Sequence, residues 1–302
     1  MKVAEALNAT APLSQFACTG ASYLNGITEP ETELAPDGTS IQDRPAELGP
    51  PGGPFNPVFT AAAPDVVLVT FGADDVQFTK VVQSCVLSEN ENPGLSGPVA
   101  GTSCLPCLQA TGRRACVPGG DVFQRDFTDE LPKLNTYYGQ LVDAIDAAAA
   151  PAAPPLIVFT DYMNPFPAQG QCPDTSPLTT DQIKFLSTEL GVLNGDVKAD
   201  VTALETGHPN VGFAEISNVL AGHTWCSTDP WDYGLSVYTP SAIRNAILYG
   251  LSRGHFGQPL SPAPFHPTPA GQQAIANVVL SVVKQLQAST SASTSADSTT
   301  SG

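Results

Sequence analysis

The chain has few basic residues, and it lacks both a long apolar run and a leader-like start. It carries 12 Lys and Arg against 29 Asp and Glu, a formal net charge of −17. Such a surface repels phosphate backbones and anionic lipids, so the charge balance argues against nucleic acid as a partner. No apolar run reaches the roughly 18 residues of a membrane span, so we expect no stable membrane insertion. Residues 1–8 lack a basic segment followed by an apolar core, so no signal peptide is visible.

The apolar content is sufficient for a substantial core. Of the 302 residues, 42% are hydrophobic and only 14% are charged, which predicts a globular protein. Seven Cys in loop-like sequence, together with 29 Pro and 26 Gly, are typical of a secreted protein with disulfides rather than of a cytosolic enzyme. We therefore expect secretion, and the acidic, Pro-rich surface favours a monomer.

Short apolar runs alternate with helical patterns along the chain. The runs at 16–18, 66–71, 156–160 and 211–216 have the character of buried strands, and amphipathic helices are predicted at 131–149, 178–204, 241–251 and 269–287. This alternation predicts an α/β fold, a three-layer α/β/α sandwich with a mostly parallel central sheet. The functional site is then expected at the carboxyl ends of the strands.

Three segments lie outside this alternating pattern. Residues 28–64 and 88–120 are long and rich in Pro and Gly, so we interpret both as surface insertions that follow a strand. The Ser/Thr/Ala-rich stretch 288–302 cannot pack a core, and it is predicted to be a disordered tail. The globular domain is accordingly assigned to residues 1–287.

A histidine stands directly before the last predicted helix. Thr268 can cap the first turn of that helix, and Pro269 suits the first helical position. His266 is therefore held rigidly at a helix start, where a catalytic base is well placed.

Polar or small residues follow three of the predicted strands. Residues 17–22, Ala-Cys-Thr-Gly-Ala-Ser, form a turn in which a glycine N–H can approach a ligand closely. Residues 72–78 begin Gly-Ala-Asp-Asp after a strongly apolar run, and residues 222–231 form a loop rich in polar, aromatic and thiol groups. All three are expected at the same edge of the sheet as His266.

In this order, the motifs resemble the SGNH (GDSL-type) hydrolases, in particular their secreted actinobacterial lipases and esterases. Residues 17–22 resemble the second family block, residues 72–75 the third, residues 222–231 the Gly-His-x-x-Cys…Pro-Trp loop, and residues 265–271 the fifth block. The resemblance implies an enzyme that cleaves small-molecule or lipid carboxylic esters. The reaction would pass through an acyl-serine and need no metal or organic cofactor. It assigns His266 as the base, and Gly20 and the position of Asp74 as the oxyanion hole.

The chain departs from the family pattern at its start. The first family block carries the nucleophilic serine well upstream of the second block, whereas only 16 residues precede Ala17. We therefore expect the domain to be N-terminally incomplete, with residues 1–10 forming the tail of the helix that follows the nucleophile block. A rival alignment of residues 20–26, Gly-Ala-Ser-Tyr-Leu-Asn-Gly, to a degenerate first block would instead make Ser22 the nucleophile.

Two further departures affect the catalytic groups themselves. Asp74 stands where the family has an oxyanion-binding Asn, and an ionised carboxylate repels a developing oxyanion, so Asp75 or backbone N–H groups would have to compensate. Ala263 stands where an acid would orient His266, so a main-chain carbonyl would have to take that part.

The resemblance also groups the cysteines. It implies that Cys172 pairs with Cys226 and that Cys18 has lost its partner with the missing block. The remaining four cysteines lie in or beside one insertion, where secretion favours two disulfides of open pairing over a zinc site: Cys85, Cys104, Cys107 and Cys116.

Two function classes therefore remain open. The first is a secreted ester hydrolase that is impaired without its nucleophile block. The second is a non-catalytic pseudo-hydrolase that binds a lipid or a glycan. Of the other histidines, His208 and His255 are expected at the surface, and His223 at the rim of an acyl pocket.

Overall fold

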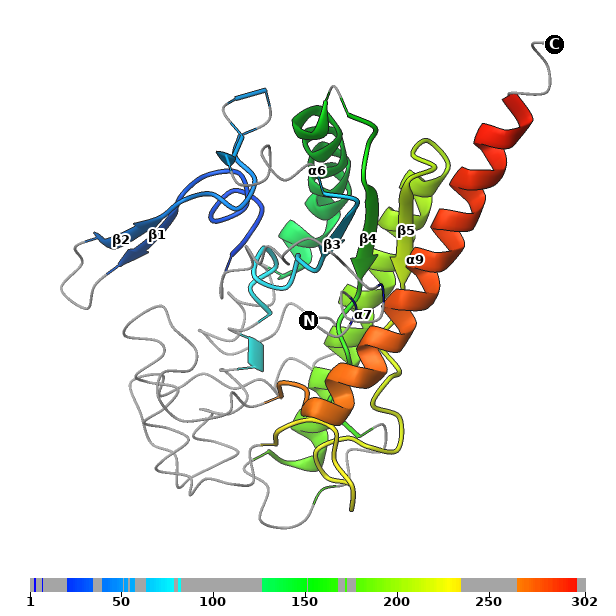
Figure 1. Cartoon of the computed structure of the whole chain (residues 1–302). Helices are drawn as coiled ribbons and strands as arrows, with labels where there is room; N and C mark the ends of the chain where they lie inside the picture. Colours follow the sequence, from blue (N-terminus) through cyan, green and yellow to red (C-terminus); the bar gives the residue numbers. More distant parts are fainter. Residues whose placement is uncertain are drawn as a thin grey trace.

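The structure is a computed structural model of the whole chain (Figure 1). It describes residues 3, 7, 21–34, 40–50, 52–53, 55–57, 64–78, 81–82, 127–150, 152–167, 172, 178–234 and 265–297. The strand predicted at 16–18, the helix predicted at 241–251 and the insertion 88–120 lie outside these residues.

Three of the predicted strands pair into one parallel sheet. Its order is β3 (Val66–Val69), β4 (Leu156–Thr160) and β5 (Val211–Ala214), with Val66 opposite Leu156 and Ile157 opposite Val211. β3 and β5 end before the predicted positions 71 and 216, because the chain leaves the ladder there for hydrogen bonds made by the following loops.

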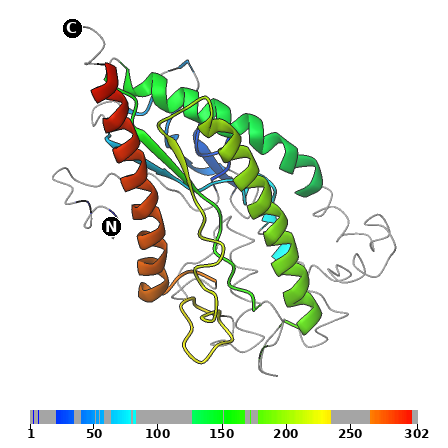
Figure 2. The same ribbon diagram turned by 90° about the vertical axis from the view of Figure 1, so that its right-hand side faces the viewer.

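Helices cover both faces of this sheet (Figure 2). A 3-10 turn, η1 (Leu131–Lys133), leads into α6 (Leu134–Ala149), which packs with α7 (Thr180–Glu205) on one face, while α9 (Pro269–Asp297) packs on β4 and β5 from the other. The predicted three-layer α/β/α arrangement is confirmed.

The central strand shows how the layers are held. Successive side chains of a strand point to opposite faces, so Ile157 and Phe159 enter the larger core beneath α6 and α7, whereas Val158 meets Val279 and Val283 of α9. Each of these residues is no more than 3% exposed. β4 is thus buried on both faces, as expected for the middle strand of a parallel sheet.

The two longest helices begin at side-chain caps that the sequence encodes. Thr179 Oγ1 accepts a hydrogen bond from Gln182 N, and the Gln182 side chain accepts one from Thr179 N, which is a complete capping box for α7. At α9, Thr268 Oγ1 accepts a hydrogen bond from Gly271 N at 3.5 Å, so the predicted cap is present.

The predicted end of the last helix was wrong. α9 continues past Gln287 to Asp297, so the stretch 288–297 of the predicted disordered tail is helical. Hydroxyl groups replace core packing there: Ser289 and Thr290 both donate to the Leu286 carbonyl, and Ser291 donates to the Gln287 carbonyl. Ser and Thr can bond back to the preceding turn in this way without leaving the helix.

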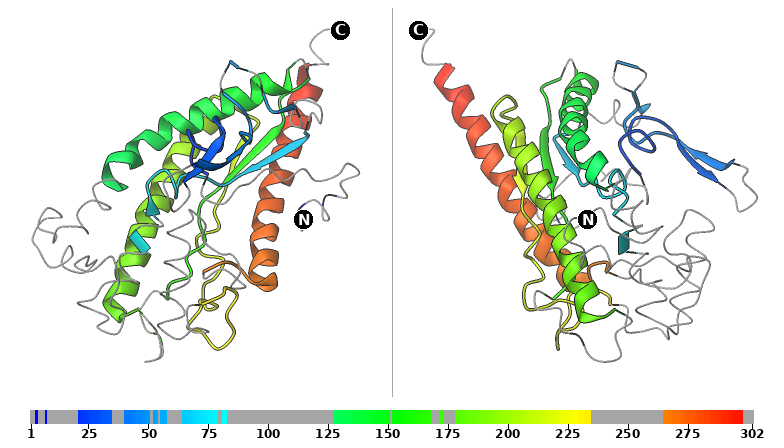
Figure 3. Two further views of the ribbon diagram at one scale, coloured as in Figure 1. Left: turned by 90° about the vertical axis from the view of Figure 1, so that its left-hand side faces the viewer. Right: turned by 180° about the vertical axis from the view of Figure 1, so that it is seen from behind.

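The insertion 28–64 contains an element that the sequence analysis missed. β1 (Glu31–Leu34) and β2 (Ser40–Arg44) form an antiparallel hairpin that projects from the molecule on the side away from α9 (Figures 1 and 3). The Pro36-Asp37-Gly38 sequence between these strands is a strong turn signal and was sufficient to predict the hairpin.

A helical turn near the start of the chain lies on the α9 face. Leu7 N donates to the Val3 carbonyl at 3.0 Å, and both side chains pack against the cluster formed by Val158, Ala214, Val279 and Val283. This placement agrees with the helix predicted within residues 1–10. In the part of the chain described here, no helix has the length and apolar character of a membrane span.

Replacing Val283 by Ala is expected to destabilise the protein by about 1–3 kcal/mol, because it removes two buried methyl groups and leaves a cavity against Val158 and Ala214. Chemical denaturation followed by circular dichroism measures this loss. Gln285→Ala, on the exposed side of the same helix, is the matched control and should change the free energy of unfolding little. Equal losses in the two variants would contradict the assigned packing of α9.

Candidate functional site

Loops from all three parallel strands meet at the carboxyl edge of the sheet. The hydroxyl groups of Thr70 and Thr160, at the ends of β3 and β4, lie 2.5 Å apart. Asp161 Oδ1 accepts hydrogen bonds from Ile216 N at 2.5 Å and Ser217 N at 3.1 Å, which join the ends of β4 and β5. Asp161 is 1% exposed, so these bonds hold a buried carboxylate whose pKa is raised by burial.

His266 lies at this edge, immediately before α9. Its carbonyl accepts a hydrogen bond from Tyr233 N at 2.8 Å, and Phe265 N donates to the Tyr233 carbonyl at 2.5 Å. Thr268 N donates to the Trp231 carbonyl at 2.8 Å, so a short antiparallel pairing fixes the chain on both sides of the histidine. The His266 side chain itself is exposed.

Phe265 holds an uncommon backbone conformation beside His266. Its φ of 63° lies in the left-handed region, which costs a non-glycine residue about 1–2 kcal/mol. Ring contacts stabilise it: its centroid lies 5.1 Å from that of Phe166 and 5.6 Å from that of Trp225. The aromatic packing thus compensates for a turn that presents the His266 ring to solvent.

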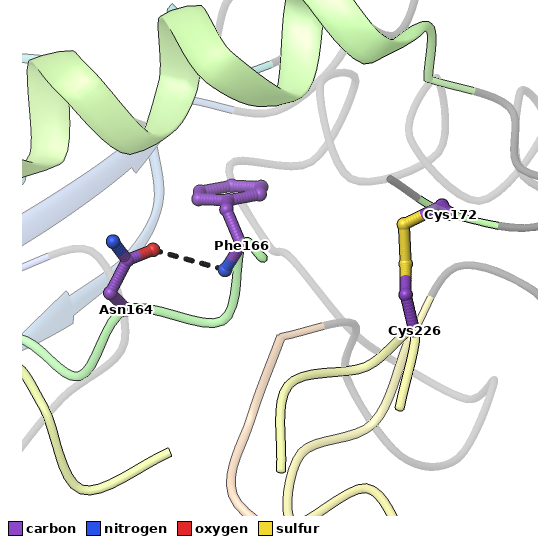
Figure 4. The surroundings of a disulfide bond; sticks show 4 residues. All are labelled: Asn164, Phe166, Cys172 and Cys226. Atoms are coloured by element: carbon purple, nitrogen blue, oxygen red, sulfur yellow. Dashed lines mark hydrogen bonds between the residues drawn. A yellow bond between two sulfur atoms is a disulfide. The ribbon is translucent and has the colours of Figure 1, made fainter. Parts of the chain in front are cut away.

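A disulfide closes the region beside this aromatic cluster (Figure 4). Cys172 and Cys226 are bonded, with their Cα atoms 5.1 Å apart, and the predicted pairing is confirmed. Next to it Phe166 N donates to Asn164 Oδ1 at 3.0 Å, which fixes the turn that carries the Phe166 ring. The Cys172–Cys226 disulfide therefore links the segment after β4 to the loop after β5.

The loop after β3 is shaped by two tyrosines. Gly72 has a φ of 119°, and a Cβ at that position would lie 3.0 Å from Tyr138 Oη, so glycine is needed for both backbone and space. Tyr138 Oη donates to the Phe71 carbonyl at 2.8 Å. Tyr162 Oη accepts from Ala73 N at 3.0 Å, which places a phenol beside the position before Asp74.

Asp74 and Asp75 place two carboxyl groups in this loop. Asp75 Oδ1 accepts a hydrogen bond from Tyr23 N at 2.8 Å, so it ties the loop to the turn at residues 21–28. Burial is the main cause that raises the pKa of Asp75 to about 6; the hydrogen bond from Tyr23 N lowers this pKa and the nearby Asp74 raises it, and the value is the net result. Asp75, which was expected to compensate for Asp74 at the oxyanion site, thus hydrogen-bonds Tyr23 N.

Ser22 makes a local turn. Its Oγ accepts a hydrogen bond from Asn25 N at 3.2 Å, its N–H donates to the Asn25 carbonyl at 2.8 Å, and its carbonyl accepts from Ile27 N. No hydrogen bond joins Ser22 to His266 among the described residues. Gly20, Cys18 and Ala263 lie outside those residues, as do the four cysteines of the insertion 88–120 and its flanks.

His223 and His208 also make defined contacts. The His223 ring stacks on Trp231 with centroids 3.8 Å apart, and its Nδ1 lies 2.9 Å from the Asp229 carbonyl. His208 lies 3.9 Å from the Asp146 carboxylate, and its side chain is 28% exposed. The described part of the chain holds no group of three or more metal-ligating side chains.

The sequence analysis missed four polar residues of this edge: Asp161, Tyr162, Asn194 and Asp232. Asp161 and Tyr162 directly follow the predicted strand 156–160, so the rule that selected residues 72–78 could have found them. Asn194 lies within a helix, and Asp232 adjoins the end of the predicted loop 222–231. No periodicity distinguishes either of them.

Asp232 is a buried carboxyl group at the base of the His266 segment. It is 1% exposed, and neither carboxylate oxygen has a hydrogen-bond partner among the described residues. Burial raises its pKa to about 7, and its own backbone N–H opposes this. Asp232 pairs with Pro267 across the short ladder, so its side chain and that of His266 point to opposite faces. It is therefore not the acid that would orient His266.

Comparison with known proteins found neither a matching family model nor a matching curated protein. Two solved structures are similar to the chain, each at 17% identity and each over 71% of this chain and 69% of the other. They are an extracellular lipase from Streptomyces rimosus, with a TM-score of 0.38, and a phospholipase A1 from Streptomyces albidoflavus NA297, with a TM-score of 0.43.

Asp232→Asn is expected to flatten the pH dependence of stability. A carboxyl whose pKa is raised on folding stabilises the protein below its unfolded pKa, near 3.8, and that contribution is lost as pH rises to about 7. The variant should remove a decline on the order of 3 kcal/mol between pH 4 and 8. Urea unfolding at four pH values measures it. Asp65→Asn, at an exposed position, should keep the decline, and a decline retained by Asp232→Asn would show that the buried group does not titrate as assigned.

Proposed function

We propose that the chain is a secreted carboxylic ester hydrolase of the SGNH (GDSL-type) family, of the lipase or esterase type. The observation that carries the proposal is the position of His266 at the carboxyl edge of a parallel sheet. It is held there by the 231–234 segment, at the same edge as the loop that contains Asp74. Sites of open α/β sheets assemble at this edge.

The proposed reaction is acyl transfer through a serine. The serine oxygen attacks the ester carbonyl as its proton passes to His266, and the alcohol leaves with that proton as the carbonyl re-forms. Water then repeats the sequence on the acyl-serine and releases the acid. The Gly20 N–H and the loop at Asp74 would face the developing oxyanion, and substrates would be small-molecule or lipid esters with no metal or organic cofactor.

We also propose that a strand upstream of Met1 supplies the nucleophile. Among the described strands, β3 pairs with β4 alone, and its Leu68 is 46% exposed, an unusual state for so apolar a strand. α6 and α7 connect β3 to β4 to β5 on one face, whereas the turn at Val3 and Leu7 lies on the other. Because parallel crossovers are right-handed, a helix on that face is expected to belong to a strand beyond the edge of β3 that no described strand covers.

Secretion is supported by the disulfide and the acidic composition. Cys172–Cys226 is a partly buried disulfide of the kind that persists in oxidising compartments, and a charge of −17 suits an extracellular protein.

The alternative is a non-catalytic pseudo-hydrolase that binds a lipid or a glycan in the same place. Three observations favour it: the carboxylate at Asp74, the alanine at 263, and the use of Ser22 Oγ within its own turn. Activity distinguishes the two proposals.

The chain as it stands should hydrolyse a p-nitrophenyl ester of a short acid poorly, because the favoured alignment matches none of its serines to the family nucleophile. The expected deficit relative to a version extended by its upstream codons is on the order of 10³-fold or more. In that extended version, His266→Ala should remove the gain, whereas His208→Ala, at a partly exposed histidine paired with Asp146, should keep it.

Two results would redirect the assignment. Fast hydrolysis by the unextended chain that disappears on Ser22→Ala would make Ser22 the nucleophile. Inactivity of the extended version would favour the binding protein.

Thiol labelling tests the proposed missing block. If Cys18 has lost its partner, the unfolded and unreduced chain should label once, at Cys18, since the other six cysteines would be paired. Peptide mapping identifies the labelled position. Labelling spread over Cys85, Cys104, Cys107 and Cys116, with one zinc bound per chain, would indicate a metal site instead.

A further inference from the structure

Tyr162 is held at the carboxyl edge more firmly than a loop residue usually is. Asn194, a 7% exposed residue of α7, accepts a hydrogen bond from Tyr162 N at 2.9 Å and donates one to the Tyr162 carbonyl at 2.7 Å. The buried amide therefore fixes both backbone groups of one residue. Such a double contact fixes the direction in which the side chain leaves the backbone.

The phenol of Tyr162 reaches the loop after β3. Its Oη accepts a hydrogen bond from Ala73 N at 3.0 Å, and this contact uses an oxygen lone pair rather than the hydroxyl proton. Among the described residues, no group accepts that proton. Asp74 and Asp75, the charged groups of this loop, lie near enough to act on the phenol, but neither is hydrogen-bonded to it.

The hydroxyl also keeps its proton. Burial raises the pKa of Tyr162 well above its usual value, Asp74 and Asp75 raise it further, and the Ala73 N–H opposes them. The phenol is thus a neutral hydrogen-bond donor near neutral pH.

We propose that Tyr162 is a catalytic residue whose hydroxyl group donates a hydrogen bond to the carbonyl oxygen of an ester bound at the loop after β3. It would supply the donor that a carboxylate at position 74 cannot supply when ionised. The phenol retains its proton, so no covalent bond changes at Tyr162. The inference rests on the proposed ester hydrolase function, which it makes more specific by naming an oxyanion donor from the loop after β4.

The test uses a ligand that needs no nucleophile. A straight-chain methyl ketone, isotopically labelled at its carbonyl carbon, is titrated into the chain, and the carbonyl stretch of the bound ketone is recorded by infrared difference spectroscopy. We expect a stretch shifted to lower frequency in the wild type. Tyr162→Phe should lose this shift and bind about 5- to 10-fold more weakly, the change for one lost hydrogen bond.

Tyr138→Phe is the matched control. It also removes a phenol that hydrogen-bonds the backbone of this loop, through the Phe71 carbonyl, but Tyr138 is 1% exposed and its proton is already used. It should keep the shifted stretch. If Tyr162→Phe fails to fold, replacement of Tyr162 by O-methyltyrosine carries the test, since it keeps the oxygen that accepts from Ala73 N and has a methyl group in place of the hydroxyl proton.

Three results would overturn the inference. The first is that the wild type binds no ketone, and the second is that the bound ketone shows the same carbonyl stretch in the Tyr162 variant as in the wild type. The third is that Tyr138→Phe loses as much of the shift and of the affinity as Tyr162→Phe. Because the ketone is not hydrolysed, the outcome is independent of whether the nucleophile block is present. An inactive chain that binds the ketone through Tyr162 would retain the hydrogen bond from Tyr162 to the carbonyl, while the hydrolase proposal, and with it the catalytic role of Tyr162, failed.

Discussion

Burial of β4 between two apolar layers is the constraint on which the rest of the structure depends. Its side chains alternate between the core beneath α6 and α7 and the stripe of α9, so β4 cannot shift by one residue without moving each set into the layer shaped for the other. The parallel register with β3 and β5 then fixes where each strand ends. Three loops are consequently delivered to one edge, and any chemistry of this chain is determined by what those loops carry.

Hydrogen bonds between polar groups join the loops at that edge. Asp161 joins the ends of β4 and β5, the hydroxyls of Thr70 and Thr160 join β3 to β4, and Asn194 holds Tyr162 from α7. Thr160, Asp161 and Asn194 are buried, where an unpaired donor or acceptor costs about 1–3 kcal/mol. The edge therefore has one low-energy arrangement, as a preorganised site requires.

The layers and the histidine could be predicted from the sequence because they depend on local patterns. Apolar runs gave the three strands, helical periodicity gave α6 and α7, and Thr268 with Pro269 marked the start of α9 and so the position of His266. The end of α9 could not be predicted by the same means, since the helix continues beyond Gln287 through a Ser/Thr/Ala-rich sequence that lacks an apolar periodicity. Asn194 was equally hidden, because a polar residue within a helix gives no sign that it faces a strand end rather than solvent.

The continuation of α9 to Asp297 has a practical consequence. Gly212, at the start of β5, lies beside Val282 and Leu286, so the turns after Gln287 pass beyond the amino edge of the sheet, opposite to His266 (Figure 1). At about 1.5 Å per residue, this helical segment is a spacer of roughly 15 Å. A surface or carrier domain attached after it would therefore be held away from the edge where the three loops meet, and the protein could be immobilised with that edge open to large or aggregated substrates.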